Sequence, residues 1–191
     1  PVRQRDQPLR LIWASRWEHD KGPETFFAAL RVLRDRCIDF RLSVLGESFG
    51  HVPSCFEVAR QEFSGNITRW GFLSDLAEYQ MVLAASDVVV STADHEFFGI
   101  AMVGAVAAGC FPLAPCRLAY PEVLGTASDW FYDGTVENLA SRLVELDVRL
   151  RDQGQLWTGE DRSREMIDRF GWDHVATDMD HALEGLYSSA Q

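Results

Sequence analysis

The chain has 191 residues, of which 47% are hydrophobic and 25% charged, a composition typical of one globular domain and not of a disordered chain. No apolar run reaches the roughly 18 residues that a membrane span needs, and residues 1–7 are too polar for the apolar core of a signal peptide. The net charge of −11 argues against an extended nucleic-acid surface but leaves room for one small phosphate pocket.

Predicted strands and helices alternate along the chain. Residues 9–15 form an apolar run typical of a strand, and Pro23 opens an amphipathic helix that reaches about Cys37. Further strands are predicted at 40–45, 67–73, 87–92 and 111–116, with helices at 53–63, 75–85, 99–108, 135–150 and 161–188. This order predicts a single α/β domain over residues 1–191, a Rossmann-like parallel sheet flanked by helices, with a possible hinge at 151–160.

Parallel sheets of this kind bind ligands at the carboxyl ends of their strands, so the loops there are the first candidates for a site. The loop after the first strand carries Arg16 and Lys21. These two cations beside a helix N-terminus could neutralise a diphosphate. The alternative is a solvated loop in which they pair with Glu18, Asp20 or Glu24.

A second loop, after the strand at 87–92, leads into a helix of small residues. The backbone amides of Phe98, Gly99 and Ile100 at that helix start could hold negative charge. Glu96 would repel a phosphate bound there, so we expect it to face neutral hydroxyls such as those of a sugar. The alternative is a helix cap in which Glu96 serves only the helix dipole. His95 and His19 are the histidines beside these loops.

Two glycines end neighbouring strands: Gly46, followed by Glu47, and Gly71, followed by Phe72 and Leu73. A ligand could lie on bare backbone at either glycine, although an ordinary turn glycine is an equal alternative. Neither a Ser-His-Asp set nor a metal-ligand spacing such as H-E-x-x-H is evident, so we predict neither a metal nor a cofactor. The cysteines have no C-x-x-C spacing, which favours reduced thiols and a cytoplasmic protein.

Together these loops resemble the C-terminal domain of the retaining GT-B glycosyltransferases of family 4. The pattern lies in Arg16, in Lys21-Gly22, and in Glu96 followed by Phe97-Phe98-Gly99. The resemblance implies that Arg16 and Lys21 bind the donor diphosphate without a metal, and that Glu96 contacts the transferred sugar. The family's second glutamate, which usually holds the ribose, would fall at position 104, where this chain has glycine.

Within that family the chain looks most like the tRNA-queuosine mannosyltransferase group. The matching segments are 16–21, 43–47, 70–73, 91–99 and 120–122. The resemblance implies a GDP-mannose donor and a tRNA acceptor held by an N-terminal domain that this chain lacks, against which helices at 161–191 could pack. Two alternatives remain open: a sugar-nucleotide epimerase with a GT-B fold, and a non-catalytic binding module.

The predicted site therefore has three catalytic residues, Arg16, Lys21 and Glu96. Its donor-binding residues are Gly46, Glu47, Gly71, Phe72, Leu73, His95, Phe97, Phe98, Gly99 and Ile100.

Overall fold

The computed structural model describes residues 7–48, 50–125, 128–157 and 166–189. Its centre is a six-stranded parallel sheet with the strand order β3-β2-β1-β4-β5-β6. The order reverses between β1 and β4, and that switch point is where α/β sheets bind ligands. The strands are β1 (Leu9–Ala14), β2 (Phe40–Leu45), β3 (Ile67–Gly71), β4 (Val88–Val90), β5 (Phe111–Pro115) and β6 (Phe131–Tyr132).

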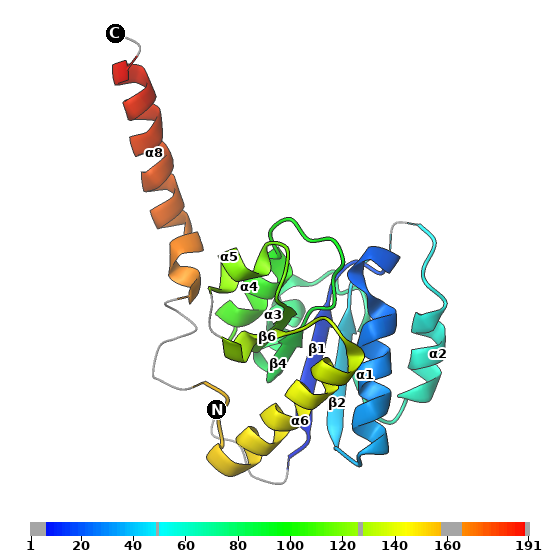
Figure 1. Cartoon of the computed structure of the whole chain (residues 1–191). Helices are drawn as coiled ribbons and strands as arrows, with labels where there is room; N and C mark the ends of the chain where they lie inside the picture. The colour runs from blue at the N-terminus through cyan, green and yellow to red at the C-terminus, as the bar shows by residue number, and fades with distance from the viewer. Residues whose placement is uncertain (1–6, 49, 126–127, 158–165, 190–191) are drawn as a thin grey trace.

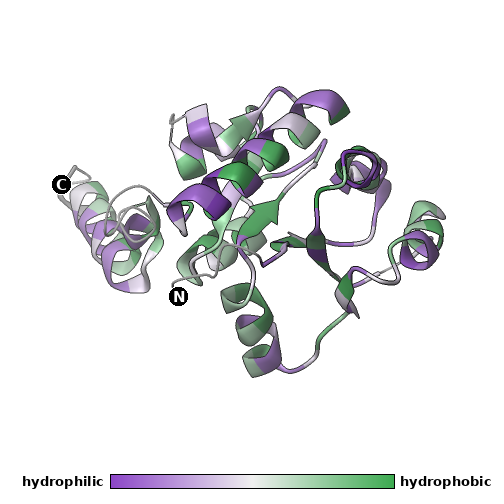
Figure 2. Ribbon diagram, turned by 90° about the horizontal axis from the view of Figure 1, so that it is seen from below, coloured by the Kyte–Doolittle hydropathy of each residue, from purple (hydrophilic) through white to green (hydrophobic). Residues whose placement is uncertain are grey.

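Helices cover both faces of the sheet (Figures 1 and 2). One face is buried by α1 (Pro23–Asp35), α2 (Cys55–Glu62) and α6 (Val136–Gln153). The other face is buried by α3 (Leu76–Ala84), α4 (Ile100–Ala107) and α5 (Tyr120–Leu124). Within the described ranges, the remaining elements are the 3-10 turns η1 (His19–Lys21), η2 (Ser128–Trp130) and η3 (Asp168–Phe170), and the helix α8 (Trp172–Ser189).

Alternate side chains of strand β1 pack into the cores on the two faces of the sheet. Leu11 and Trp13 point into the core under α1 and α6, whereas Ile12 points into the core under α3 and α4. All three side chains are at most 1% exposed, as expected for a central strand buried on both faces. The alternation also sends Arg10 to the α3 side, near the start of the strand.

The structure confirms the predicted fold class, and the long elements before residue 154 lie within a few residues of their predicted positions. The helix predicted at 161–188 is wrong at 168–171, where the chain forms the turn η3, and α8 begins only at Trp172. The shorter elements η1, α5, η2, β6 and η3 were not predicted. Helix α6 runs to Gln153 and ends at Gly154, three residues beyond the predicted end. The predicted start of the last helix at 161 lies outside the described residues, as does part of the predicted hinge. Among helices within the described ranges, none is both long and apolar enough to cross a membrane.

The loops that follow the strands gather at one edge of the sheet, the upper edge in Figure 1. Helix α8 rises from the body and extends past this same edge. The fold therefore brings segments that are far apart in the sequence to one side of the domain, as the parallel strand order requires.

Candidate functional site

Two adjoining hollows lie at the carboxyl ends of the strands. The larger has a volume of about 290 Å³ and is lined by the loops after β1 and β4 and by the start of α4. The smaller, of about 220 Å³, is lined by the ends of β1 and β2, the loop after β3, and α3. Ala14, Ser15, Arg16 and Ala101 line both hollows, so the two form one continuous depression at the switch point. They bring together ten of the predicted residues: Arg16, Lys21, Gly46, Glu47, Phe72, Leu73, Glu96, Phe97, Gly99 and Ile100.

Lys21 is the buried cation of the larger hollow. Its residue is only 7% exposed, and its Nζ donates to the His95 carbonyl oxygen at 2.5 Å. The same Nζ lies 3.4 Å from Glu96 Oε2 and 3.5 Å from Asp20 Oδ2. A charge removed from water to this extent requires such partners. The ion cluster therefore fixes the position of the lysine before any ligand binds.

The loops after β1 and β4 are joined by hydrogen bonds. The Asp20 carbonyl accepts from the amides of Asp94 at 2.8 Å and His95 at 3.2 Å. Thr92 Oγ1 donates to the Lys21 carbonyl at 2.8 Å, and Trp13 Nε1 donates to the same hydroxyl oxygen at 3.1 Å. These bonds hold the two loops against each other across the switch point.

Gly22 permits this close contact between the loops. It has a φ of 60°, and a Cβ placed there would lie 2.2 Å from the Thr92 carbonyl oxygen. Both its left-handed conformation and the absent side chain are therefore required at this position.

The Glu96 carboxylate caps the start of α4. Its Oε1 accepts from the amide of Gly99 at 2.9 Å and from that of Phe98 at 3.4 Å. Two of the three amides that we expected to face a ligand's charge are thus hydrogen-bonded to Glu96 in the structure. These contacts are those of the capping alternative, because unpaired amides at a helix start favour the nearest carboxylate. The amides of Ile100 and the next residues still lack intrahelical acceptors by helix geometry.

Arg16 lies where the two hollows meet, with its side chain 51% exposed. Its Nη1 lies 2.9 Å from Glu18 Oε2 and 3.2 Å from Glu18 Oε1. The structure thus shows the pairing alternative for Arg16. An exposed ion pair of this kind contributes only about 0–1 kcal/mol, so an incoming anion can displace Glu18 at small cost.

The structure explains in different ways why positions 46 and 71 are glycine. At Gly46 a Cβ would lie 1.8 Å from the Ser15 carbonyl oxygen, so the residue is required by the close approach of the β1 end and not only by a ligand. Gly71 adopts a φ of 108° and its carbonyl accepts from the Gly46 amide at 3.2 Å. Glu47, beside them, is exposed and lines the smaller hollow.

Three predicted residues lie outside the linings of the two hollows: Gly71, His95 and Phe98. His95 contributes its carbonyl to Lys21, and its side chain is exposed. The Phe98 ring packs edge-on against Phe170, with ring centroids 5.2 Å apart. Phe97, in contrast, lines the larger hollow while remaining 99% exposed.

Sequence reasoning missed Tyr120 and Ser91, which line the larger hollow. The Tyr120 hydroxyl lies 2.5 Å from Ser91 Oγ. Burial raises the pKa of Tyr120 to about 12, with the hydrogen bond to Ser91 opposing and the Glu96 charge adding to the increase. The phenol is therefore neutral at pH 7 and able to donate a hydrogen bond. The available signal was their place in the matching segments 91–99 and 120–122, which follow β4 and β5 at this edge of the sheet.

The site offers cations, backbone amides and the phenols of Tyr120 and Tyr79. Its Glu96 carboxylate contacts Lys21 and two amides, whereas the Glu47 carboxylate is exposed. Within the described ranges, no group of three or more His, Cys, Asp or Glu side chains is placed to hold a metal ion. The arrangement is suited to binding a negatively charged ligand through fixed positive groups.

Solved structures define the class to which this fold belongs. The chain superposes on a sucrose-phosphate synthase from Thermosynechococcus elongatus with a TM-score of 0.71 at 22% identity, covering 97% of this chain and 47% of that one. It also superposes on the C-terminal domain of a glycosyl transferase group 1 family protein from Francisella tularensis, with a TM-score of 0.62 at 23% identity over 88% of this chain and 85% of that one. The fold is that of one domain of a GT-B glycosyltransferase.

Residues 8–147 match the family described as glycosyl transferases group 1, and the chain belongs to that family. A tRNA-queuosine alpha-mannosyltransferase from Drosophila melanogaster is 43% identical over 115 residues, which are 60% of this chain and 30% of that protein. A GDP-mannose-dependent phosphatidylinositol dimannoside mannosyltransferase from Mycobacterium tuberculosis is 28% identical over 132 residues, 69% of this chain and 34% of that protein. The matched regions thus span about a third of these relatives.

Proposed function

We propose that this chain is the donor-binding domain of a retaining, metal-independent mannosyltransferase that uses GDP-mannose. The observation that carries the proposal is the pair of adjoining hollows at the switch point, with Arg16 at their junction and Lys21 buried in the larger one. The mannosyltransferase relatives support the identity of the donor, because the names of two of them state mannose transfer.

The two hollows suggest how a nucleotide sugar would lie. The smaller hollow, with Phe72 and Leu73 on its wall, is suited to the nucleoside. The larger hollow, with Lys21, Glu96 and Tyr120, is suited to the sugar. The diphosphate would then lie at the junction, next to Arg16, whose guanidinium can donate two parallel hydrogen bonds to phosphate oxygens.

Transfer of the sugar requires stabilisation of the departing nucleoside diphosphate. Arg16, released from Glu18, and Lys21 supply positive charge at that place, and the Ile100 amide at the start of α4 supplies a further donor. Such fixed charges perform the task that a divalent cation performs in other sites, which supports metal independence. Glu96 would contact the sugar once the ligand competes for the amides it now caps.

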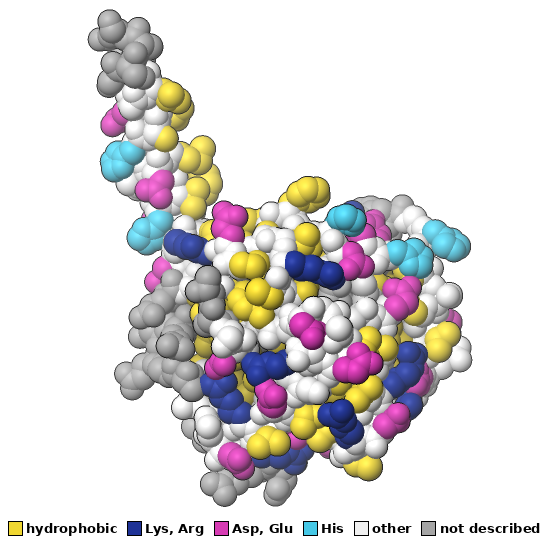
Figure 3. Space-filling model, in the orientation of Figure 1, with side chains coloured by type: hydrophobic (Ala, Val, Ile, Leu, Met, Phe, Trp, Pro, Cys, Tyr) yellow, Lys and Arg dark blue, Asp and Glu magenta, His cyan; other side chains and the backbone are white. Residues whose placement is uncertain are grey.

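The acceptor site would lie on a second domain, because the matched relatives are about three times longer than their matched regions. Helix α8 is suited to contact that domain. Its exposed apolar residues Trp172, Met179, Leu183 and Leu186 have the spacing of one helical stripe. Figure 3 shows hydrophobic side chains in yellow along one side of this helix. We further propose a tRNA acceptor held by that domain and a cytoplasmic location. The latter is supported by the free thiols of all four cysteines.

Nucleotide titration of the chain tests the donor assignment. We expect GDP and GDP-mannose to bind more tightly than UDP or ADP in isothermal titration calorimetry. A ligand at 100 times its dissociation constant should add about 2.7 kcal/mol to the free energy of unfolding. Arg16→Gln should weaken GDP binding about tenfold, whereas Glu18→Gln should strengthen it by up to about fivefold, because it releases Arg16. Arg60→Gln, an exposed change on α2, is the matched control.

The same measurements separate the alternatives. A non-catalytic module that has lost its site would bind none of the nucleotides, and Arg16→Gln would then change nothing. An epimerase would convert GDP-mannose to another sugar nucleotide without any acceptor. The proposed domain should bind the donor but transfer no sugar by itself, so turnover by the isolated chain would contradict the proposal.

A further inference from the structure

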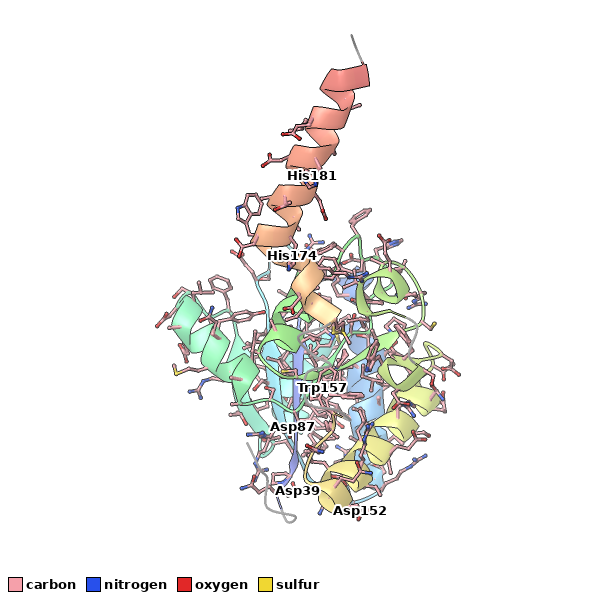
Figure 4. All side chains as sticks on the ribbon, turned by 90° about the vertical axis from the view of Figure 1, so that its left-hand side faces the viewer. Asp39, Asp87, Asp152, Trp157, His174 and His181 are labelled. Atoms are coloured by element: carbon pink, nitrogen blue, oxygen red, sulfur yellow. The ribbon has the colours of Figure 1, made fainter. Side chains whose placement is uncertain are left out.

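A separate hollow of about 350 Å³ lies at the opposite end of the sheet, between the amino-terminal parts of β1, β2 and β3 and helix α3. Figure 4 labels Asp39 and Asp87, which border this region, in the lower half of the domain and away from α8. We propose that this hollow binds a small organic anion, a phosphate or carboxylate carried on an apolar body. The proposal does not depend on the donor site.

Three arginines reach the hollow from three neighbouring strands: Arg10, Arg41 and Arg69. Arg10 pairs directly with Arg41 in the β1–β2 register, so both point to the α3 side of the sheet. Ser43 lies two residues beyond Arg41 on the same face and pairs with Arg69 of β3. The pleat therefore aligns three positive charges side by side in a chain whose net charge is −11.

The three arginines differ in how many of their hydrogen-bond donors already have partners in the structure. Arg10 makes hydrogen bonds to both oxygens of Asp87 at 2.7–3.2 Å, so it supports the wall of the hollow. Arg69 has its Nε 3.3 Å from a Glu78 oxygen and donates from Nη1 to the Thr68 carbonyl. These contacts leave its Nη2 without a hydrogen bond to the described part of the chain.

Arg41 and Ser43 provide the open donors. The Arg41 guanidinium lies 3.9 Å from Asp39 Oδ1, beyond hydrogen-bond distance, and makes no hydrogen bond to a described residue. Ser43 is 5% exposed and lines the hollow, and its hydroxyl has no hydrogen-bond partner among the described residues. The Ser43 hydroxyl oxygen is not one of the fully buried side-chain atoms that lack a partner, so it opens onto the hollow, where a bound anion can accept its hydrogen bond.

The rest of the lining defines the ligand's other part. Met81 and Val82 of α3, with Ala85 just after the helix, form an apolar wall, and the Glu78 carboxylate beside them is paired with Arg69 at 3.3 Å. The volume lies within the range of small-molecule sites, which is about 300–1,000 Å³. A bare inorganic ion would leave this wall uncovered, whereas a polynucleotide would meet the repulsion of the acidic chain. Phenyl phosphate has both features of the expected ligand and serves as the probe.

The wall itself provides a second readout. Leu83 is the one residue of α3 that is fully buried, so the helix is weakly anchored to the body. A ligand that packs on Met81 and Val82 should hold the helix in place. Hydrogen exchange of the backbone amides at 76–84 should therefore slow when phenyl phosphate binds.

Calorimetric titration of the full chain with phenyl phosphate tests the assignment. We expect saturable binding at one site, with inorganic phosphate and phenol each binding more weakly. Arg41→Gln should weaken phenyl phosphate about tenfold, equivalent to about 1.4 kcal/mol. Met81→Glu, which places a carboxylate on the exposed wall, should do the same through repulsion. Arg60→Gln should leave the affinity unchanged.

Arg16→Gln separates this site from the donor site, because it should lower GDP affinity and not phenyl phosphate affinity, with the reverse result for Arg41→Gln. The proposal is overturned if Arg41→Gln retains full phenyl phosphate affinity, if Arg16→Gln abolishes it, or if binding does not saturate. Equal affinity for inorganic phosphate would refute the apolar part of the assignment. Tighter, Arg41-dependent binding of a single-stranded RNA oligonucleotide would refute a small-molecule ligand.

Discussion

Replacing Lys21 with methionine removes the buried charge that holds the loops after β1 and β4 in place. Loss of a buried pair costs about 3–5 kcal/mol when the remaining charge cannot reach water. Here the side chains of Asp20 and Glu96 are 29% and 21% exposed, so both carboxylates can be partly rehydrated. The His95 carbonyl also loses its donor at 2.5 Å. We therefore expect about 2 kcal/mol of destabilisation.

Thermal unfolding measures this change directly. For a domain of this size, 2 kcal/mol corresponds to a decrease in Tm of about 4–8 °C. Without Lys21, the carboxylates of Asp20 and Glu96 repel each other, and the double variant Lys21→Met/Glu96→Gln relieves that repulsion. The effects of the two substitutions on the free energy of unfolding should therefore couple by about 1 kcal/mol. Simple additivity, or a Tm within about 1 °C of the unmodified chain, would refute the ion-cluster interpretation. GDP affinity should decrease in both variants.

Three further outcomes follow from local geometry and charge. Gly22→Ala should destabilise the fold by more than about 1 kcal/mol in urea unfolding, because Gly22 has a positive φ and the new Cβ would lie 2.2 Å from a carbonyl oxygen. Gly104→Ala, in open space on α4, should instead increase the free energy of unfolding by about 0.8–1 kcal/mol. Hydrogen bonding to Arg31 lowers the pKa of Glu62 below 4.5. The Glu62 carboxylate therefore stabilises the fold above pH 4.5, and this stabilisation is lost as the pH falls through the lowered pKa. The difference in the free energy of unfolding between Glu62→Gln and the unmodified chain should accordingly disappear in acid. Burial raises the pKa of Tyr120 from 10.0 to about 12, so its contribution should persist below pH 10 and disappear as the pH approaches 12, and absorbance titration of Tyr120→Phe should lack one late phenolate.

The long elements could be predicted because their apolar patterns are local. The strand Phe40–Leu45 has the predicted bounds, and the apolar run Val88–Val90 lies within its predicted strand. The parallel order then placed Lys21 and Glu96 at the same edge of the sheet without any contact being known. Strand ends alone were sufficient to locate that part of the site.

The contacts within the site could not be predicted, because they depend on side-chain direction and on distances between strands. Whether Glu96 faces a ligand or caps α4 is decided by its rotamer, and sequence spacing permits both. Gly46 is required because the carbonyl of Ser15, 31 residues earlier and just after β1, lies against it. Tyr120 lies on α5, which has five residues and is too short to show helical periodicity.

The hydrogen bonds that the amides of Asp94 and His95 donate to the Asp20 carbonyl have a consequence for protein engineering. They are backbone bonds between two loops that contribute different side chains to the hollow. If either loop were exchanged for a homologous loop of another length, the other loop would lose the hydrogen bonds that hold it in place. Loop grafts meant to alter selectivity in this domain should therefore transplant 16–22 and 91–99 as a matched pair.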